Sequence, residues 1–319
     1  MTTVVRNGIS QSPKARQRSE AHRLMRKYAP LYPLLAFGLA YFAVFNYAPL
    51  YGLQLAFKNY KIKGGIWGSP WVGWNNFHTM FIRNDFWQAF TNTIVLSLLR
   101  IIISFPVPII LAITLTDMKN RRLSRGLQIV YSLPHFLSWV TVGGILTHLL
   151  ASSGAVNSLL KSLGLAQVGF LSSGGIFRGL VVVSNIWKEG GWTSIIYLAA
   201  IAAIDPALYE SASLDGATRF QRAWHITIPS IRPTAAVMLI LALGGAMSQG
   251  FDQIFNLYNP TVFSVADIID TYIYRITFQR APNYGVSTAV GMFKGVCNAV
   301  LLLAANWVVA RLDPDSRML

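Results

Sequence analysis

The sequence predicts an all-α integral membrane protein with six transmembrane helices, and its composition is the first observation behind this prediction. The chain has 319 residues, of which 53% are hydrophobic and only 12% are charged. Its mean hydropathy is +0.45. Because a typical soluble domain carries about 25% charged residues, a surface of this composition is too apolar to face water on all sides.

The second observation is a series of apolar stretches separated by polar segments. Roughly 20 helical residues cross a hydrocarbon core about 30 Å thick, and each stretch reaches that length. Several contain proline or glycine, which packed membrane helices tolerate. The six stretches cover residues 31–55, 88–116, 126–150, 177–203, 233–257 and 285–310.

The third observation is the placement of basic residues. The net charge is +15, and 16 of the 27 Lys and Arg residues fall before residue 30, in 117–125, in 205–232 or after residue 310. Cytoplasmic loops of membrane proteins carry such an excess. We therefore predict a basic cytoplasmic tail over residues 1–29, a membrane domain over residues 30–319, both termini in the cytoplasm, and no binding of nucleic acid.

The cysteine and histidine residues predict neither a disulfide nor a metal site. Cys297 is the only cysteine in the chain. His135 and His148 lie 13 positions apart in one apolar stretch, which places them on different faces of a helix. The remaining histidines fall in separate segments, so no metal ion or other cofactor is expected on this chain.

The cytoplasmic segment over residues 205–232 is rich in helix start and stop signals. Asp205 can cap a helix that begins at Pro206, a favoured first residue. A short helix over residues 207–214 is then ended by the backbone freedom of Gly216. A second short helix, over about 217–224, leads to Pro229 and the next span. The pattern predicts a compact two-helix projection rather than an irregular loop.

This segment resembles the motif of permease subunits of binding-protein-dependent ABC importers: Glu-Ala-Ala, three residues, Gly, nine residues, then Ile-x-Leu-Pro. At identical spacing, this chain has Glu210-Ser211-Ala212, Gly216 and Ile226-x-Ile228-Pro229. The residues beside the glycine also match a common Asp-Gly-Ala variant, as Asp215 and Ala217. The departures, Ser211 for Ala and Ile228 for Leu, are small changes in size.

The resemblance implies a type I, maltose-permease-like fold in which this loop is a coupling helix held in a groove of an ATPase subunit. Glu210 would be a charged contact, Ala212 would allow close packing, and Gly216 would set the bend. The implied coupling residues are Glu210, Ser211, Ala212, Asp215, Gly216, Ala217, Ile226 and Pro229. The alternative is that the two acidic residues only solvate the loop and cap its helices.

The resemblance also implies partners and a location, the bacterial inner membrane with its lipid. The chain has no Gly-x-x-x-x-Gly-Lys-Ser/Thr loop for a nucleotide, so it is not expected to be an enzyme. ATP and Mg would be used by two separate ATPase subunits. A second homologous permease subunit would complete the translocation path, and a periplasmic substrate-binding protein would deliver the substrate.

Further segments resemble the branch of sugar permeases that serves polygalacturonan-type and alginate-type oligosaccharides. They are residues 51–58, 73–77, 92–93, 187–192 and 195–200. The resemblance therefore implies an oligosaccharide substrate, and an acidic one such as alginate or oligogalacturonate.

Polar residues at membrane depth are costly and usually face the protein interior or an aqueous path. In the predicted fifth span, residues 249, 252, 253 and 256 share one helical face. The candidates for a translocation path are Gln249, Asp252, Gln253, Asn256, Asn185, Trp187, Lys188, Trp192, Arg100, Lys294 and Asn298. Hydrogen bonding between helices is the alternative role for these residues.

Two other classes of protein remain as alternatives. A self-contained secondary transporter or channel for a polar solute would need coupling carboxylates near the midplane, where Glu189 is the only good candidate. It would also leave the two-helix projection unexplained. A membrane enzyme would need a nucleophile–base pair or a metal constellation, which the sequence does not contain. A permease that works by alternating access is the favoured interpretation.

Overall fold

The computed structural model describes residues 27–248, 250–279 and 282–312. Contacts within the chain separate two units, residues 1–54 and 55–319, and each is described by itself. The described residues are almost entirely helical, and their only β-bridges are two isolated pairs, Lys58 with Trp71 and Lys61 with Gly65. Most of the predicted tail, residues 1–26, lies outside the described residues.

The first unit contains one apolar helical run. It is built from η1 (Ala29–Leu31), α2 (Tyr32–Phe42), η2 (Ala43–Tyr47) and η3 (Ala48–Phe57), the last of which extends past the unit boundary. No side chain of α2 is buried. The run Tyr32–Phe57 is long and apolar enough to cross a membrane, as predicted for residues 31–55.

The second unit holds all the other described helices. In chain order they are η4 (Ile62–Gly64), α3 (Gly65–Gly68), α4 (Asn75–Phe81), α5 (Asn84–Leu99), η5 (Arg100–Ser104), α6 (Pro106–Thr116), α7 (Arg121–Ser132), η6 (Leu133–Phe136), α8 (Trp139–Leu150), α9 (Ala155–Ser162), α10 (Gly174–Ala202), α11 (Pro206–Leu214), α12 (Arg219–Arg222), η7 (Ala223–Thr227), α13 (Ile228–Gly244), η8 (Ala246–Ser248), α14 (Phe251–Leu257), η9 (Pro260–Val262), α15 (Phe263–Ala266), α16 (Ile269–Tyr274), η10 (Arg275–Gln279) and α17 (Tyr284–Leu312).

Long apolar helices of the second unit confirm the predicted membrane fold. Four runs could each cross a membrane: Asn84–Thr116, Trp139–Ser162, Arg219–Gly244 and Tyr284–Arg311. A further run, Gly174–Ala202, is followed by Pro206–Leu214 after a bend of 74°. With the run of the first unit, the described residues hold five such helices, or six if the bent pair is one span.

The predicted third span over residues 126–150 is wrong as one helix. The chain forms α7 and then α8, separated by the short 3-10 helix η6. Pro134 lies in η6 and has no backbone N–H to continue the α-helical ladder. Ser138 starts the next helix by accepting a hydrogen bond from the Thr141 N–H at 3.1 Å. The apolar run therefore begins at Trp139 and reaches Ser162, beyond the predicted end of the span at residue 150.

The predicted fifth span over residues 233–257 is also wrong as one helix. The helix is continuous from Arg219 through Pro229 to Gly244, and the chain then breaks before α14. Gly250 has a φ of +95°, and a Cβ there would overlap the Arg100 guanidinium. Only glycine adopts this left-handed conformation without strain and leaves that space open.

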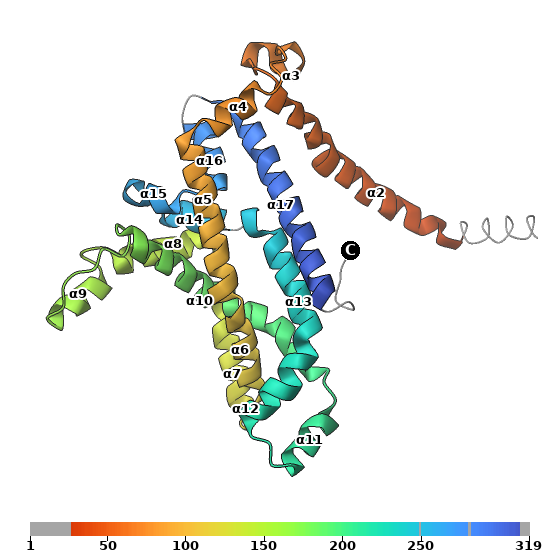
Figure 1. Ribbon diagram of the computed structural model, residues 1–319, viewed down its shortest axis with the longest axis vertical. Coiled ribbons are helices and arrows are strands. Elements are labelled where there is room, and N and C mark those ends of the chain that lie inside the picture. The colour runs from red at the N-terminus through yellow and green to blue at the C-terminus, as the bar shows by residue number, and fades with distance from the viewer. Residues whose placement is uncertain (1–26, 249, 280–281, 313–319) are drawn as a thin grey trace, which may run out of the picture. The chain divides into compact units, whose positions relative to one another are not determined.

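Four apolar clusters hold the second unit together. One joins α4, α5, α16 and α17 through Met80, Phe86, Tyr272 and Val290. A second joins α5, α10, α14 and α15, and a third joins α6, α10 and α13. The fourth fixes α13 along α17, and Figure 1 shows these two helices side by side. Helices α11 and α12 lie at one end of the unit, and α4 and α16 lie at the other (Figure 1).

The segment over residues 258–279, between the last two predicted spans, is deeply packed. Ile269, Thr271 and Tyr272 are fully buried. Asp267 forms a buried ion pair with Arg275. Burial raises the pKa of the Asp267 carboxyl above its ordinary value, and the nearby Arg275 charge opposes the rise.

Candidate functional site

Helix α11 is exposed along most of its length at one end of the second unit. None of its residues is buried, and the Leu214 side chain is 89% exposed. On the adjoining segment Phe220 and Trp224 stack on each other with ring centroids 6.2 Å apart, and both remain exposed. A projecting helix with open apolar side chains is typical of a surface that a partner covers.

Local hydrogen bonds fix the shape of this projection as predicted. The Asp205 carboxylate accepts from the Ala207 N–H at 2.9 Å and caps α11. Gly216 has a φ of +77° and ends the helix, and the Ala217 N–H then donates to the Ala212 carbonyl at 2.9 Å. The predicted second short helix is wrong in extent, because α12 begins at Arg219 and continues through η7 into α13.

The structure brings five of the eight predicted coupling residues around one hollow between α11 and α12, of about 300 Å³. These residues are Ala212, Asp215, Gly216, Ala217 and Ile226. Glu210 is exposed and lines a different cavity, towards α7. Ser211 and Pro229 are exposed and line neither space.

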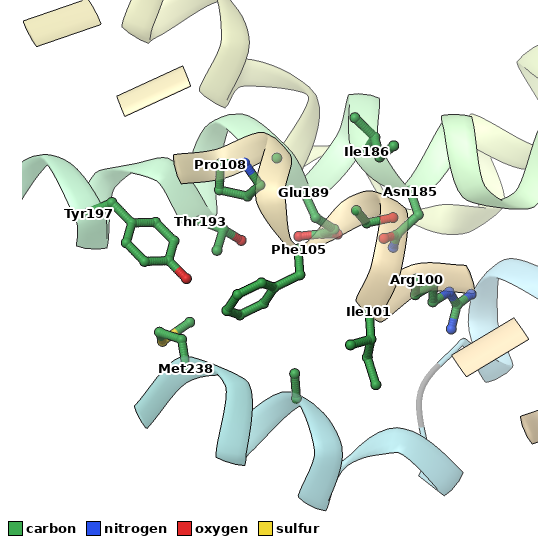
Figure 2. A pocket seen from close by; sticks show the side chains of 13 residues that line it. Arg100, Ile101, Phe105, Pro108, Asn185, Ile186, Glu189, Thr193, Tyr197 and Met238 are labelled. Carbon is green, nitrogen blue, oxygen red and sulfur yellow. The ribbon is translucent and has the colours of Figure 1, made fainter. Parts of the chain in front are cut away.

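A second candidate site is a cavity of about 270 Å³ between η5, α6, α10 and α13, named here the Arg100 cavity. Arg100, Asn185 and Glu189 are polar residues of its lining. In Figure 2, Arg100 and Asn185 lie at one end, Tyr197 and Met238 at the other, and Phe105 between them. Of the predicted path residues, the cavity therefore unites Arg100 and Asn185.

Several polar atoms of the Arg100 cavity have no partner among the described residues. They are Arg100 Nε, Ser104 Oγ and Tyr197 Oη, all buried. The Arg100 guanidinium donates to Gln253 Oε1 at 2.5 Å, and no described carboxylate forms an ion pair with it. A buried cation without a counter-charge, beside free hydroxyls, is costly unless a ligand binds there.

Gln253 bonds to Arg100 from the side of α14. Its amide nitrogen donates to the Val181 carbonyl at 2.7 Å and to Ser184 Oγ at 2.9 Å. The side chain is only 1% exposed. It therefore joins α14 to α10 and holds the guanidinium in place.

Lys188 and Glu189 form a charged cluster with a histidine that the sequence did not single out. Lys188 Nζ donates to Glu189 Oε1 and to the His135 carbonyl, each at 2.9 Å. The other carboxylate oxygen of Glu189 lies 2.7 Å from His135 Nδ1. The His135 ring stacks on Trp192 with centroids 4.6 Å apart and an interplanar angle of 2°. The break at Pro134 is the sequence signal that would have separated His135 from a helix.

The remaining residues predicted for the translocation path either contact other helices or are exposed. Lys294 pairs with Asp270 at 2.5 Å, and Asn298 holds η8 through the Met247 N–H at 3.1 Å. Asn256 packs against Gly143 of α8. Asp252 and Trp187 are exposed, while Gln249 lies outside the described residues. The break at Gly250 leaves Asp252, Gln253 and Asn256 together on the short helix α14.

Among the described residues, no group of three or more His, Cys, Asp and Glu side chains converges as a metal site would require. The coupling projection and the Arg100 cavity both belong to the second unit.

Known proteins match this chain over most of its length. Residues 89–317 match the model for "Binding-protein-dependent transport system inner membrane component". Protein LplB of Bacillus subtilis (strain 168) is 41% identical, covering 89% of this chain and 90% of that protein. The polygalacturonan/rhamnogalacturonan transport system permease protein YteP of the same organism is 40% identical, covering 89% and 88%.

Crystal structures of a bacterial ABC transporter that imports the acidic polysaccharide alginate contain a chain of the same fold. In one, the TM-score is 0.85 at 41% identity, with 92% of this chain and 99% of that chain covered. In the other, which includes a periplasmic protein bound to alginate pentasaccharide, the TM-score is 0.83, with 91% and 97% covered. These matches confirm the predicted permease fold, and the chain belongs to the family of binding-protein-dependent transport system inner membrane components.

Proposed function

We propose that this chain forms half of the translocation path of an ATP-driven importer for an acidic oligosaccharide, of the alginate or oligogalacturonate kind. The observation that carries the substrate class is Arg100, a buried cation that lines a cavity with no ion-pair partner among the described residues. The 41% identity to a chain of an alginate importer supports the same substrate class.

Family membership makes the chain a transport component rather than an enzyme. In the proposed assembly, a second homologous permease completes the path and two ATPase subunits bind ATP and Mg. The predicted orientation, with both termini in the cytoplasm, places α11 on the ATPase side. Glu210 and the α11–α12 hollow are then the parts that meet the ATPase. The exposure of Leu214, Phe220 and Trp224 supports a covered surface there.

The Arg100 cavity offers the chemistry that an acidic sugar needs. The guanidinium would donate to a uronate carboxylate, since such charge-assisted bonds are among the strongest in proteins. Ser104, Asn185 and Tyr197 would exchange hydrogen bonds with sugar hydroxyls. Alternating access then needs only that the cavity open to one side at a time, as ATP binding shifts the population of states.

The test is uptake of a uronate oligosaccharide by the reconstituted importer, comparing Arg100→Gln with Arg232→Gln. Arg232 is an exposed arginine of α13 outside the cavity, so its variant controls for loss of charge. Loss of a charge-assisted hydrogen bond costs about 1.5–3 kcal/mol, so kcat/KM for Arg100→Gln should fall roughly 10- to 100-fold. Arg232→Gln should stay within about twofold of wild type.

Tyr197→Phe provides a second arm that keeps Arg100 intact. It removes a hydroxyl with no partner among the described residues, so the folded subunit should be as stable as wild type. Reduced uptake by this variant would place the sugar in the cavity. Unchanged uptake by both cavity variants would contradict the proposed path.

A further inference from the structure

A cavity lined by basic residues lies at the α11 end of the second unit. It measures about 860 Å³ and is lined by α6, α7, α10, α11 and α12. Four arginines line it, Arg121 and Arg125 from α7 and Arg219 and Arg222 from α12. We propose that this α7–α12 cavity binds a phosphate-bearing anion, either the headgroup of an anionic phospholipid or free phosphate.

The charges around the cavity do not balance within the described residues. Arg219 and Arg222 share one carboxylate, that of Asp117, with N–O distances of 3.5 and 3.9 Å. Arg121 and Arg125 form no ion pair among the described residues, and the Nε atom of Arg222 is buried without a hydrogen-bond partner. Two cations of the lining therefore lack a counter-charge, and Glu210 is the only other carboxylate on it.

The positive-inside rule accounts for basic residues on this side of the membrane but not for their convergence. Arg122 follows Arg121 directly yet does not line the cavity. Arg121 and Arg125, one helical turn apart, both do. The first turn of α7 also carries arginines and no acid, which opposes the positive end of the helix dipole. A bound anion would relieve both sources of repulsion.

The size and position of the cavity fit a phosphate group with a substituent. Its volume falls within the roughly 300–1,000 Å³ of small-molecule sites. In the proposed orientation it lies at the cytoplasmic end of the membrane helices, and basic pockets between such helices recognise anionic headgroups. The inference rests on the proposed function only for this choice of side.

A ligand here would act on the coupling projection. Pro206, Tyr209 and Glu210 of α11 line the same cavity as the arginines of α7. A phosphate bound between them would therefore connect α11 to the membrane helices and fix its angle to α10. The site would make the coupling helix sensitive to the anion in the surrounding membrane or cytoplasm.

The experiment measures the unfolding temperature of the full chain, purified with its natural partners in neutral detergent, without sugar or ATP. Three probes are titrated: dioctanoyl phosphatidylglycerol, dioctanoyl phosphatidylcholine and inorganic phosphate. The proteins are wild type, the pair Arg121→Gln/Arg125→Gln, and Arg122→Gln as a control on the same turn. Arg125→Gln alone serves if the pair is not folded.

An anion that binds the folded state raises its unfolding temperature. Phosphatidylglycerol should raise it in wild type and Arg122→Gln. Each arginine near an anionic headgroup contributes about 1 kcal/mol to the binding free energy. The double substitution Arg121→Gln/Arg125→Gln should therefore weaken phosphatidylglycerol binding roughly 30-fold. An equal effect of inorganic phosphate would identify free phosphate as the ligand. No shift with either anion, or equal shifts in all three proteins, would overturn the site. Neither result depends on transport.

Discussion

The coupling projection and the Arg100 cavity differ in where their polar groups find hydrogen-bond partners. In the projection, Asp205, Gly216 and Ala217 close their bonds within a few residues along the chain. In the cavity, Arg100 reaches Gln253, 153 positions away, and buried atoms of Ser104 and Tyr197 stay without partners among the described residues. A locally closed element can move as a unit, whereas a site held by distant contacts depends on how its helices pack.

Gly191→Val tests the helix packing on which the Arg100 cavity depends, and it should have the largest effect. A Cβ at Gly191 would overlap the backbone carbonyl of Tyr131, so α10 and α7 could not approach. Because the obstacle is backbone, the subunit should lose its assembled form rather than relax. The measurement is the yield of monodisperse complex in detergent. The control is Gly179→Ala on the same helix, where a Cβ has open space; normal yield of Gly191→Val would contradict the packing.

Gly216→Pro tests the coupling projection, whose shape is set by hydrogen bonds between near neighbours in the sequence. Proline holds φ near about −65°, whereas Gly216 has a φ of +77°. The end of α11 should therefore be remodelled while the membrane helices stay packed. We expect normal insertion and assembly, with uptake reduced at least about tenfold if the bend transmits the ATPase movement. Normal uptake would count against coupling through α11.

Lys188→Met separates helix packing from substrate contact. Lys188 as a residue is only 5% exposed, and its ammonium group bonds to Glu189 and to the His135 carbonyl. Its loss should lower the free energy of unfolding by about 1–3 kcal/mol, measured by thermal denaturation in detergent, with KM for the sugar unchanged. A raised KM with unchanged stability would move Lys188 into the translocation path.

Asp205→Ala should have the smallest effect. Loss of a helix N-cap costs about 1 kcal/mol, and the cost should stay within α11, which has no buried residue. Faster hydrogen exchange of the α11 amides, with an unchanged unfolding temperature, is the expected result. Asp205→Asn retains a capping oxygen and is the matched control. Equal exchange in both variants would show that the cap does not hold the helix.

The sequence predicted the projection closely because its determinants are local. The cap at Asp205, the helix and the left-handed Gly216 all follow from neighbouring residues. The four spans without an internal break were also predicted to within a few residues. Family motifs then supplied the class of transporter.

The Arg100 cavity could not be predicted from neighbouring residues in this way. Gly250, at the break before α14, leaves room for the guanidinium of Arg100, a residue 150 positions earlier. Similarly, His135 became part of a charged cluster only because η6 packs against α10 near Lys188. Helical periodicity placed Asp252 and Asn256 on a shared face, but could not show that the helix would begin anew at Phe251.

The most direct test of the central claim is uptake by proteoliposomes containing the purified complex, with the binding protein outside and ATP either inside or absent. Bound subunits are identified by mass spectrometry of the same sample. The account predicts a second permease and an ATPase in the complex, and uronate uptake only with ATP. Recovery of this chain alone, with uptake that needs no ATP, would contradict energy input through α11 and indicate a self-contained transporter.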